Sequence, residues 1–175
     1  MRYVMRSGVL YREPNCALVK LKGVFVGPEK RVHLLDGTLV LRTSIKEFDV
    51  PADRKADVRS HAYVMLNAKD EEIAVARPDY ADGDDPAVVG WPICRMPRVD
   101  HAAVTIHGKQ YLLTMQNSQN YTLRDRAGYI VVQIMHRGLI GGWNMEVDED
   151  FAPEILCGLF AFCRYIEQEN EFLVV

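Results

Sequence analysis

The stretch Asp148-Glu-Asp-Phe-Ala-Pro153-Glu-Ile-Leu-Cys-Gly-Leu-Phe-Ala-Phe-Cys163 decides the fold of this chain. Its acidic residues suit the electropositive start of a helix, and Pro153 fits a first turn, where its missing N–H is not needed. We therefore predict a helix from Pro153 to Gln168. No polar side chain occurs from Ile155 to Cys163, so every direction around the helix axis is apolar. Such a helix cannot lie on the surface of a soluble protein.

An apolar helix can also span a membrane, but a membrane span needs about 20 apolar residues. Here Arg164 interrupts the run, and the acidic sequence Glu167-Gln-Glu-Asn-Glu171 follows. We therefore expect the helix to be enclosed by protein. Gly158 costs about 1 kcal/mol in a helix, so its presence predicts a close approach by whatever surrounds it.

The rest of the chain has the sequence pattern of an all-β protein. Short runs of β-branched, aromatic and aliphatic residues alternate with turn residues at spacings of roughly ten residues. The predicted strands are Tyr3–Tyr11, Ala17–Val26, Arg31–Leu35, Thr38–Ile45, Ala62–Leu66, Glu71–Ala76, Val88–Cys94, Ala102–Ile106, Lys109–Met115, Tyr121–Arg124, Tyr129–Met135 and Trp143–Val147. A closed sheet would enclose the helix and leave no exposed edge. We predict a mainly β fold, a closed antiparallel barrel of about twelve strands around the buried apolar C-terminal helix.

Glycines mark the clearest hairpins. Asp36-Gly37, His107-Gly108 and Gly128 supply the positive φ that tight turns need. The stretches Lys46–Ser60 and Arg77–Ala87 are charged and contain proline, so we predict surface loops there.

Length, composition and charge narrow the class of protein. A chain of 175 residues, 49% of them hydrophobic, fits one domain spanning residues 1–175. Its 21 basic and 24 acidic residues give a net charge of -3, which argues against nucleic acid as a partner. A local basic patch is still compatible with this net charge. The N-terminus has no apolar signal segment, which predicts a cytoplasmic location. The four cysteines lack zinc-site spacing, and we interpret them as reduced, mostly buried thiols: Cys16, Cys94, Cys157 and Cys163.

The C-terminal third carries a family resemblance. Tyr121-Thr-Leu-Arg-Asp125 with Gly128, then Gly142-Trp-Asn-Met-Glu-Val147, an acidic stretch and the apolar helix follow one another. This arrangement resembles the tubby C-terminal-like superfamily, which includes the LURP-one-related proteins and the phospholipid scramblases. The resemblance implies a twelve-stranded barrel with the helix threaded through it. Tubby proteins are known for binding phosphoinositide headgroups, and scramblases are associated with lipid movement and calcium.

The resemblance implies a non-enzymatic binding or scaffold module, with an anionic phospholipid or a phosphorylated molecule as its ligand. No calcium segment or phosphoinositide pocket matches particular positions, so no functional residue is carried over. From the residues themselves, a candidate anion-binding patch consists of basic side chains in loops and at hairpin ends: Arg95, Arg98, Lys109, Arg124 and Arg126. The alternative is that they are ordinary solubilising charges paired with Asp100 and Asp125.

An enzyme acting on a small molecule is a second hypothesis, with its site near Asp100, His101 and His136. Asp100 and His101 are the one adjacent acid–histidine pair, but neighbouring residues on a strand point to opposite faces, so we expect them not to cooperate. No nucleophile motif, phosphate loop or metal constellation accompanies them, so we assign no catalytic residue, cofactor or metal.

Two further expectations concern ions and partners. The carboxylates of the second loop do not have EF-hand spacing, and we interpret them as a solvated acidic loop: Asp79, Asp82, Asp84 and Asp85. A protein-interaction or homo-oligomerising module is the third hypothesis. Because the helix would fill the barrel, any site is expected on the loops or the outer wall.

Overall fold

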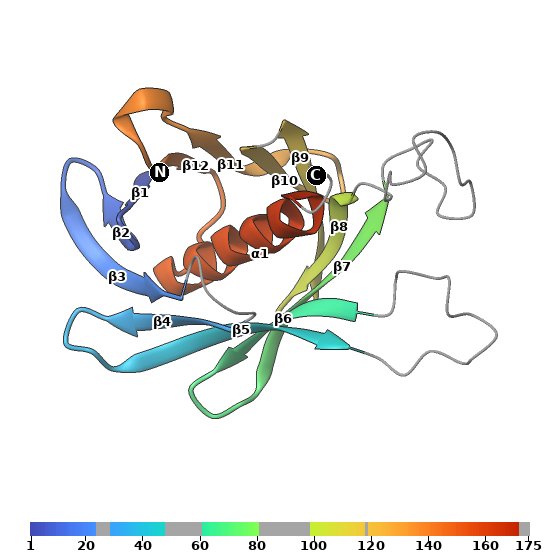
Figure 1. Cartoon of the computed structure of the whole chain (residues 1–175), viewed down its shortest axis with the longest axis horizontal. Helices are drawn as coiled ribbons and strands as arrows, with labels where there is room; N and C mark the ends of the chain where they lie inside the picture. Colours follow the sequence, from blue (N-terminus) through green and yellow to red (C-terminus); the bar gives the residue numbers. More distant parts are fainter. Residues whose placement is uncertain (24–28, 48–60, 81–98, 118, 172–175) are drawn as a thin grey trace.

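The computed structural model describes residues 1–23, 29–47, 61–80, 99–117 and 119–171, and its strands form one closed antiparallel barrel (Figure 1). The predicted fold class is confirmed. The strands are β1 (Arg2–Arg6), β2 (Val9–Arg12), β3 (Cys16–Lys22), β4 (Lys30–Leu34), β5 (Leu39–Glu47), β6 (His61–Asn67), β7 (Glu72–Tyr80), β8 (Val99–Ile106), β9 (Lys109–Asn117), β10 (Asn120–Asp125), β11 (Ile130–His136) and β12 (Trp143–Val147).

The barrel is an up-and-down meander, because each strand pairs with its neighbours in the sequence. One further pairing, between β1 and β12, closes the ring, with Met5 opposite Trp143 and Tyr3 opposite Met145. Successive strands run in opposite directions, so the connections alternate between the two ends of the barrel. The turns β4–β5 and β10–β11 therefore lie at one end, and the turns β1–β2 and β11–β12 lie at the other.

The helix α1 (Pro153–Glu171) runs through the ring of strands (Figure 1). All residues from Ile155 to Ile166 are buried, Arg164 included, and the helix contacts β3, β4, β5, β6 and β8. The predicted start at Pro153 and the predicted enclosure are both confirmed. A Cβ atom on Gly158 would lie 2.5 Å from Sδ of Met65, which is itself fully buried, so β6 does approach the helix backbone closely here.

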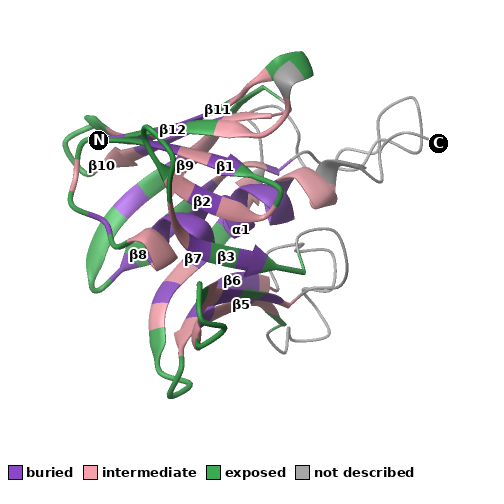
Figure 2. Cartoon of the chain, turned by 90° about the vertical axis from the view of Figure 1, so that its left-hand side faces the viewer, coloured by how far each residue is buried: buried purple, intermediate pink, exposed green. Residues whose placement is uncertain are grey.

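The strands alternate between the two sides of the barrel wall, as Figure 2 shows in purple and green. On β9, Tyr111, Leu113 and Met115 point inward and are buried. The intervening side chains point outward. The inner faces of the strands and the helix together make one hydrophobic core.

The predicted strand Tyr3–Tyr11 is wrong in one respect, because it is two strands joined by a tight turn. Ser7 and Gly8 both have positive φ, 50° and 73°, as a two-residue hairpin turn requires. A Cβ atom on Gly8 would lie 2.7 Å from the carbonyl oxygen of Leu21, so glycine is also needed for space. The three turns predicted from Gly37, Gly108 and Gly128 are confirmed, each glycine having positive φ.

The two predicted loops begin later than expected. Strand β5 continues to Glu47, and β7 continues through Arg77 and Pro78 to Tyr80. Pro78 is tolerated because its pairing is with Ala102 of β8, whereas the pairing of β6 with β7 ends at Tyr63 and Ala76. The remainder of both loops lies outside the described residues, and so does the predicted strand Val88–Cys94.

Two of the cysteines lie on the enclosed helix. Cys157 and Cys163 are buried free thiols, and burial raises the pKa of both well above the ordinary value. Cys16 is a free thiol exposed at the start of β3, and Cys94 lies outside the described residues.

Candidate functional site: a basic outer face

The filled barrel leaves its outer wall and its ends as places for a site. Inside, polar side chains are used to join the helix to the wall. Tyr165 of α1 and Thr43 of β5 share a buried hydrogen bond of 2.8 Å. Near the C-terminal end of α1, Glu169 contacts His61 at 2.7 Å and accepts a short hydrogen bond from Tyr63. These contacts fasten the helix in place.

Only part of the predicted anion-binding patch falls within the described residues. Arg95 and Arg98 lie outside them. Lys109 and Arg126 line the same surface cavity of about 780 Å³, at the turns β8–β9 and β10–β11. Three carboxylates line this cavity as well, those of Asp125, Asp148 and Glu149, so its charge is mixed.

Two basic residues at this end of the barrel, Lys109 and Arg124, bind groups of the protein itself. Lys109 Nζ lies 2.8 Å from an oxygen of Glu149, just before the helix. The hydroxyl of Tyr111 donates to the same carboxylate at 2.9 Å, and burial and this hydrogen bond raise the pKa of Tyr111 to about 12. Arg124 donates to the carbonyl oxygen of Gly128 at 2.9 Å, across the turn β10–β11. Lys109 and Arg124 therefore have protein partners, although Lys109 does not pair with the predicted aspartates.

Asp100 and His101 do contact each other, contrary to the expectation from strand alternation. Nδ1 of His101 lies 2.6 Å from Oδ1 of Asp100. The cause is an irregularity in the pairing of β7 with β8, where Asp79 pairs with His101 and Tyr80 pairs with Val99. Asp100 is the extra residue of this bulge, and a bulge redirects a side chain that regular alternation would turn away.

His136 does not join this pair. It lies at the end of β11, whereas His101 lies on β8, and β9 and β10 separate the two strands. Strands are spaced about 4.8 Å apart, so three spacings separate the two strands by roughly 14 Å around the wall. His101 is level with Gln133 of β11, so His136 is also displaced by three residues along the strand. The ring of His136 packs against that of Trp143, with centroids 5.1 Å apart. The structure therefore does not assemble Asp100, His101 and His136 into one site.

A different group of basic residues gathers on the outer wall of β3, β4 and β5. Lys22 lies directly opposite Arg31, and Arg31 lies directly opposite Arg42. This makes a row of three cations across three neighbouring strands. We call the surface formed by the following residues the basic face: Arg6, Lys20, Lys22, Arg31, His33 and Arg42.

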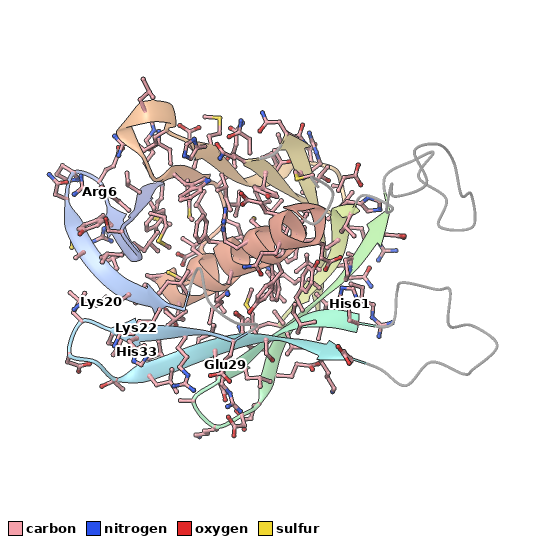
Figure 3. All side chains as sticks on the ribbon, in the orientation of Figure 1. Arg6, Lys20, Lys22, Glu29, His33 and His61 are labelled. Atoms are coloured by element: carbon pink, nitrogen blue, oxygen red, sulfur yellow. The ribbon has the colours of Figure 1, made fainter. Side chains whose placement is uncertain are left out.

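A second row extends the basic face to the first strand of the barrel. Lys20 lies opposite His33 on one side and opposite Val9 on the other, and Val9 lies opposite Arg6. Arg6 and Lys20 are exposed. Figure 3 shows Arg6, Lys20, Lys22 and His33 along the left-hand side of the molecule, outside the strands that surround the helix.

Acidic side chains neutralise the basic face only in part. Glu29 pairs with Arg31 at 2.5 Å, and Asp70 pairs with Arg42 at 2.6 Å. Within the described ranges, Lys20 and Lys22 make no ion pair. Arg6 of β1 also makes no ion pair within those ranges, so the positive charge of the face is concentrated on Arg6 and on the lysines of β3.

The sequence carries a signal for this face, which lies on strands and not in the loops and hairpin ends where the anion-binding patch was predicted. The first 47 residues contain nine Lys and Arg against four Asp and Glu, whereas the remaining 128 contain 12 against 20. On β3, Lys20 and Lys22 are two residues apart, the spacing that places side chains on one side of a strand. By contrast, the outward positions of β9 are uncharged: Gln110, Leu112, Thr114 and Gln116.

Within the residues that the structure describes, no group of three or more His, Cys, Asp or Glu side chains is placed to hold a metal ion. In the same part of the chain, no helix is long and apolar enough to span a membrane. No protein-family model, curated protein or solved structure matches this chain.

Proposed function

We propose that this protein is a non-enzymatic binding module whose basic face docks on an anionic phospholipid surface. The observation that carries the proposal is the row Lys22, Arg31 and Arg42 on an outer wall formed by a chain of net negative charge. Phosphate and carboxylate headgroups attract such a row, each Lys or Arg near the surface contributing about 1 kcal/mol. The family resemblance implies the same class of ligand.

The energetic cost of the row supports a functional role. Like charges directly opposite each other on neighbouring strands destabilise a sheet. Glu29 and Asp70 relieve part of this repulsion at Arg31 and Arg42, and they leave Lys22 without such relief among the described residues. Natural proteins accept destabilising arrangements of this kind at functional sites. An anionic surface would remove the repulsion when it binds.

Co-sedimentation with vesicles tests the proposal. We expect binding to vesicles of phosphatidylcholine with about a third phosphatidylserine, weak binding to phosphatidylcholine alone, and a steep loss of binding as salt is raised. Lys22→Glu should weaken binding about tenfold or more, because it removes one attractive charge and adds a repulsive one. Lys22 is exposed, so this variant should melt like the wild type.

Arg126→Glu is the matched control, because it makes the same change in net charge at an exposed residue of the β10–β11 turn. We expect it to leave vesicle binding unchanged. If Arg126→Glu weakens binding and Lys22→Glu does not, the β10–β11 end is the docking surface and the basic face is not. Absence of binding to anionic vesicles at low salt would overturn the proposal. If pyrophosphate displaces the protein from vesicles, and the protein binds vesicles no more tightly than it binds pyrophosphate, the basic face would be assigned to a soluble phosphorylated ligand instead.

A further inference from the structure

The connection between β11 and β12 presents a large apolar side chain to solvent. It contains a short 3-10 helix, Gly138–Ile140, and the side chain of Leu139 is fully exposed, at 109% of its reference area. Figure 2 shows this connection at the top of the molecule, standing out from the barrel. Among the large hydrophobic side chains that the structure describes, the next most exposed, Tyr129, reaches 73% and carries a polar hydroxyl.

Leu139 is held in this position by a defined turn. Gly138 and Gly141 have positive φ, 61° and 73°, and the amide of Gly141 donates to the carbonyl of Gly138 at 3.1 Å. Gly142 follows, and a Cβ atom there would lie 2.5 Å from the carbonyl oxygen of Met5. Glycine at 142 thus lets the base of the turn pack closely on the end of β1. The 3-10 helix Gly138–Ile140, which we call the β11–β12 tip, is therefore held in one position on the barrel.

The tip adjoins the basic face. The hypothetical Cβ of Gly142 also lies 3.5 Å from Cα of Arg6, the residue where the second basic row begins. Arg137, at the start of the connection, and Arg6 line one surface groove of about 600 Å³ together with Tyr11 and Glu13. Leu139 therefore projects from an end of the barrel close to two arginines, Arg6 and Arg137.

The outer wall beside this groove is only weakly polar. Met135, Asn144, Val4 and Tyr11 lie opposite one another in turn across β11, β12, β1 and β2. Three of these four side chains are apolar or aromatic. Apolar groups next to cations match the boundary of an anionic bilayer, where headgroups meet acyl chains.

We infer that the β11–β12 tip inserts Leu139 into the boundary between headgroups and acyl chains when the basic face meets an anionic bilayer. The inference rests on the proposed function and narrows its ligand to a lipid bilayer. The bilayer is favoured over a soluble phosphorylated molecule because Leu139 is fully exposed, and such a molecule would offer this side chain no apolar environment. Burial of apolar area in the membrane supplies the driving force.

A tryptophan placed at the tip reports insertion directly. We expect Leu139→Trp to show a blue-shifted emission on addition of phosphatidylserine-containing vesicles, and quenching when the acyl chains are brominated. Tyr129→Trp is the matched control, because Tyr129 is also exposed but follows the β10–β11 turn at the other end of the barrel. It should show neither effect. Both spectra are compared with the wild type, which contains two tryptophans of its own.

Affinity gives a second, independent measurement. Leu139→Ala should weaken vesicle binding about tenfold, the loss expected when a leucine side chain that enters the membrane is truncated. Its melting temperature should not change, because the side chain makes no buried contact. Binding of pyrophosphate should be unaffected.

The outcomes separate the two claims. If anionic vesicles bind with the expected salt dependence but the Leu139→Trp variant keeps an unshifted, unquenched emission, or Leu139→Ala binds as well as the wild type, insertion is refuted and electrostatic docking stands. If the wild type does not bind anionic vesicles at all, both claims fail. A concentration-dependent self-association that Leu139→Ala abolishes in the absence of lipid would identify a second copy of the chain as the occupant and would also refute insertion.

Discussion

Truncating Phe160 tests the enclosure of the helix most directly. Phe160 is 2% exposed, and its ring packs edge-on against that of Trp143, with centroids 4.9 Å apart. Phe→Ala at a buried site costs about 3–5 kcal/mol, including the cavity left behind. The aromatic pair adds about 0.5–1.5 kcal/mol beyond its buried area, which favours the upper half of that range. We therefore expect Phe160→Ala to lose about 4 kcal/mol of the free energy of unfolding.

Urea unfolding followed by far-UV circular dichroism measures this loss. At the scale of this chain, about 4 kcal/mol corresponds to a fall of roughly 8–16 °C in the melting temperature. Tyr129→Ala, at an exposed position, should stay within about 0.5 kcal/mol of the wild type. An m-value equal to that of the wild type is needed for the comparison to hold. A loss below about 1 kcal/mol for Phe160→Ala would refute the enclosure of this face of α1.

Gly158→Ala should destabilise the protein by about 1–3 kcal/mol despite the better helix propensity of alanine, because the added methyl group overlaps Met65. In urea unfolding, the double variant with Met65→Ala should lose less free energy of unfolding than the sum of the two single variants. Gly142→Ala should cost at least about 2 kcal/mol, since alanine at φ 83° is strained and its Cβ would strike the Met5 carbonyl at the β1–β12 closure; a melting temperature equal to that of the wild type would contradict this. The raised pKa of Tyr111, about 12, means that the folded state holds this proton more tightly than the unfolded state, whose pKa is about 10. Its contribution to stability should therefore be complete below about pH 10 and lost as pH rises toward 12, and Tyr111→Phe should make the urea midpoint fall less steeply over that window.

The fold could be predicted because its strongest constraint is local. A run with no polar side chain from Ile155 to Cys163 has no stable place on a surface, so its surroundings follow from the sequence alone. The Ser7-Gly8 turn was missed because the strands on both sides of it are β-like and only four or five residues long. The bulge at Asp100 could not be predicted from the sequence, because it arises from the register between β7 and β8.

The basic face could be predicted from the sequence only in part. Lys20 and Lys22 share one side of β3, and Arg31 and His33 share one side of β4, as period-two spacing indicates. Whether two such sides meet depends on the register of each hairpin, which a shift of one residue would invert. In a meander, sequence neighbours are also neighbours in space, so the excess of basic residues in the first 47 was the usable signal.

The position of α1 after all twelve strands has a consequence for synthesis of the protein. Ribosomes deliver the chain from its N-terminus, so the strands emerge before the helix that covers their inner faces. Until α1 is made, the nascent sheet has no centre to close around, and its apolar side is open to other chains. Folding should therefore wait for α1, and the chain whose strands have been made without α1 is the form that most needs a chaperone.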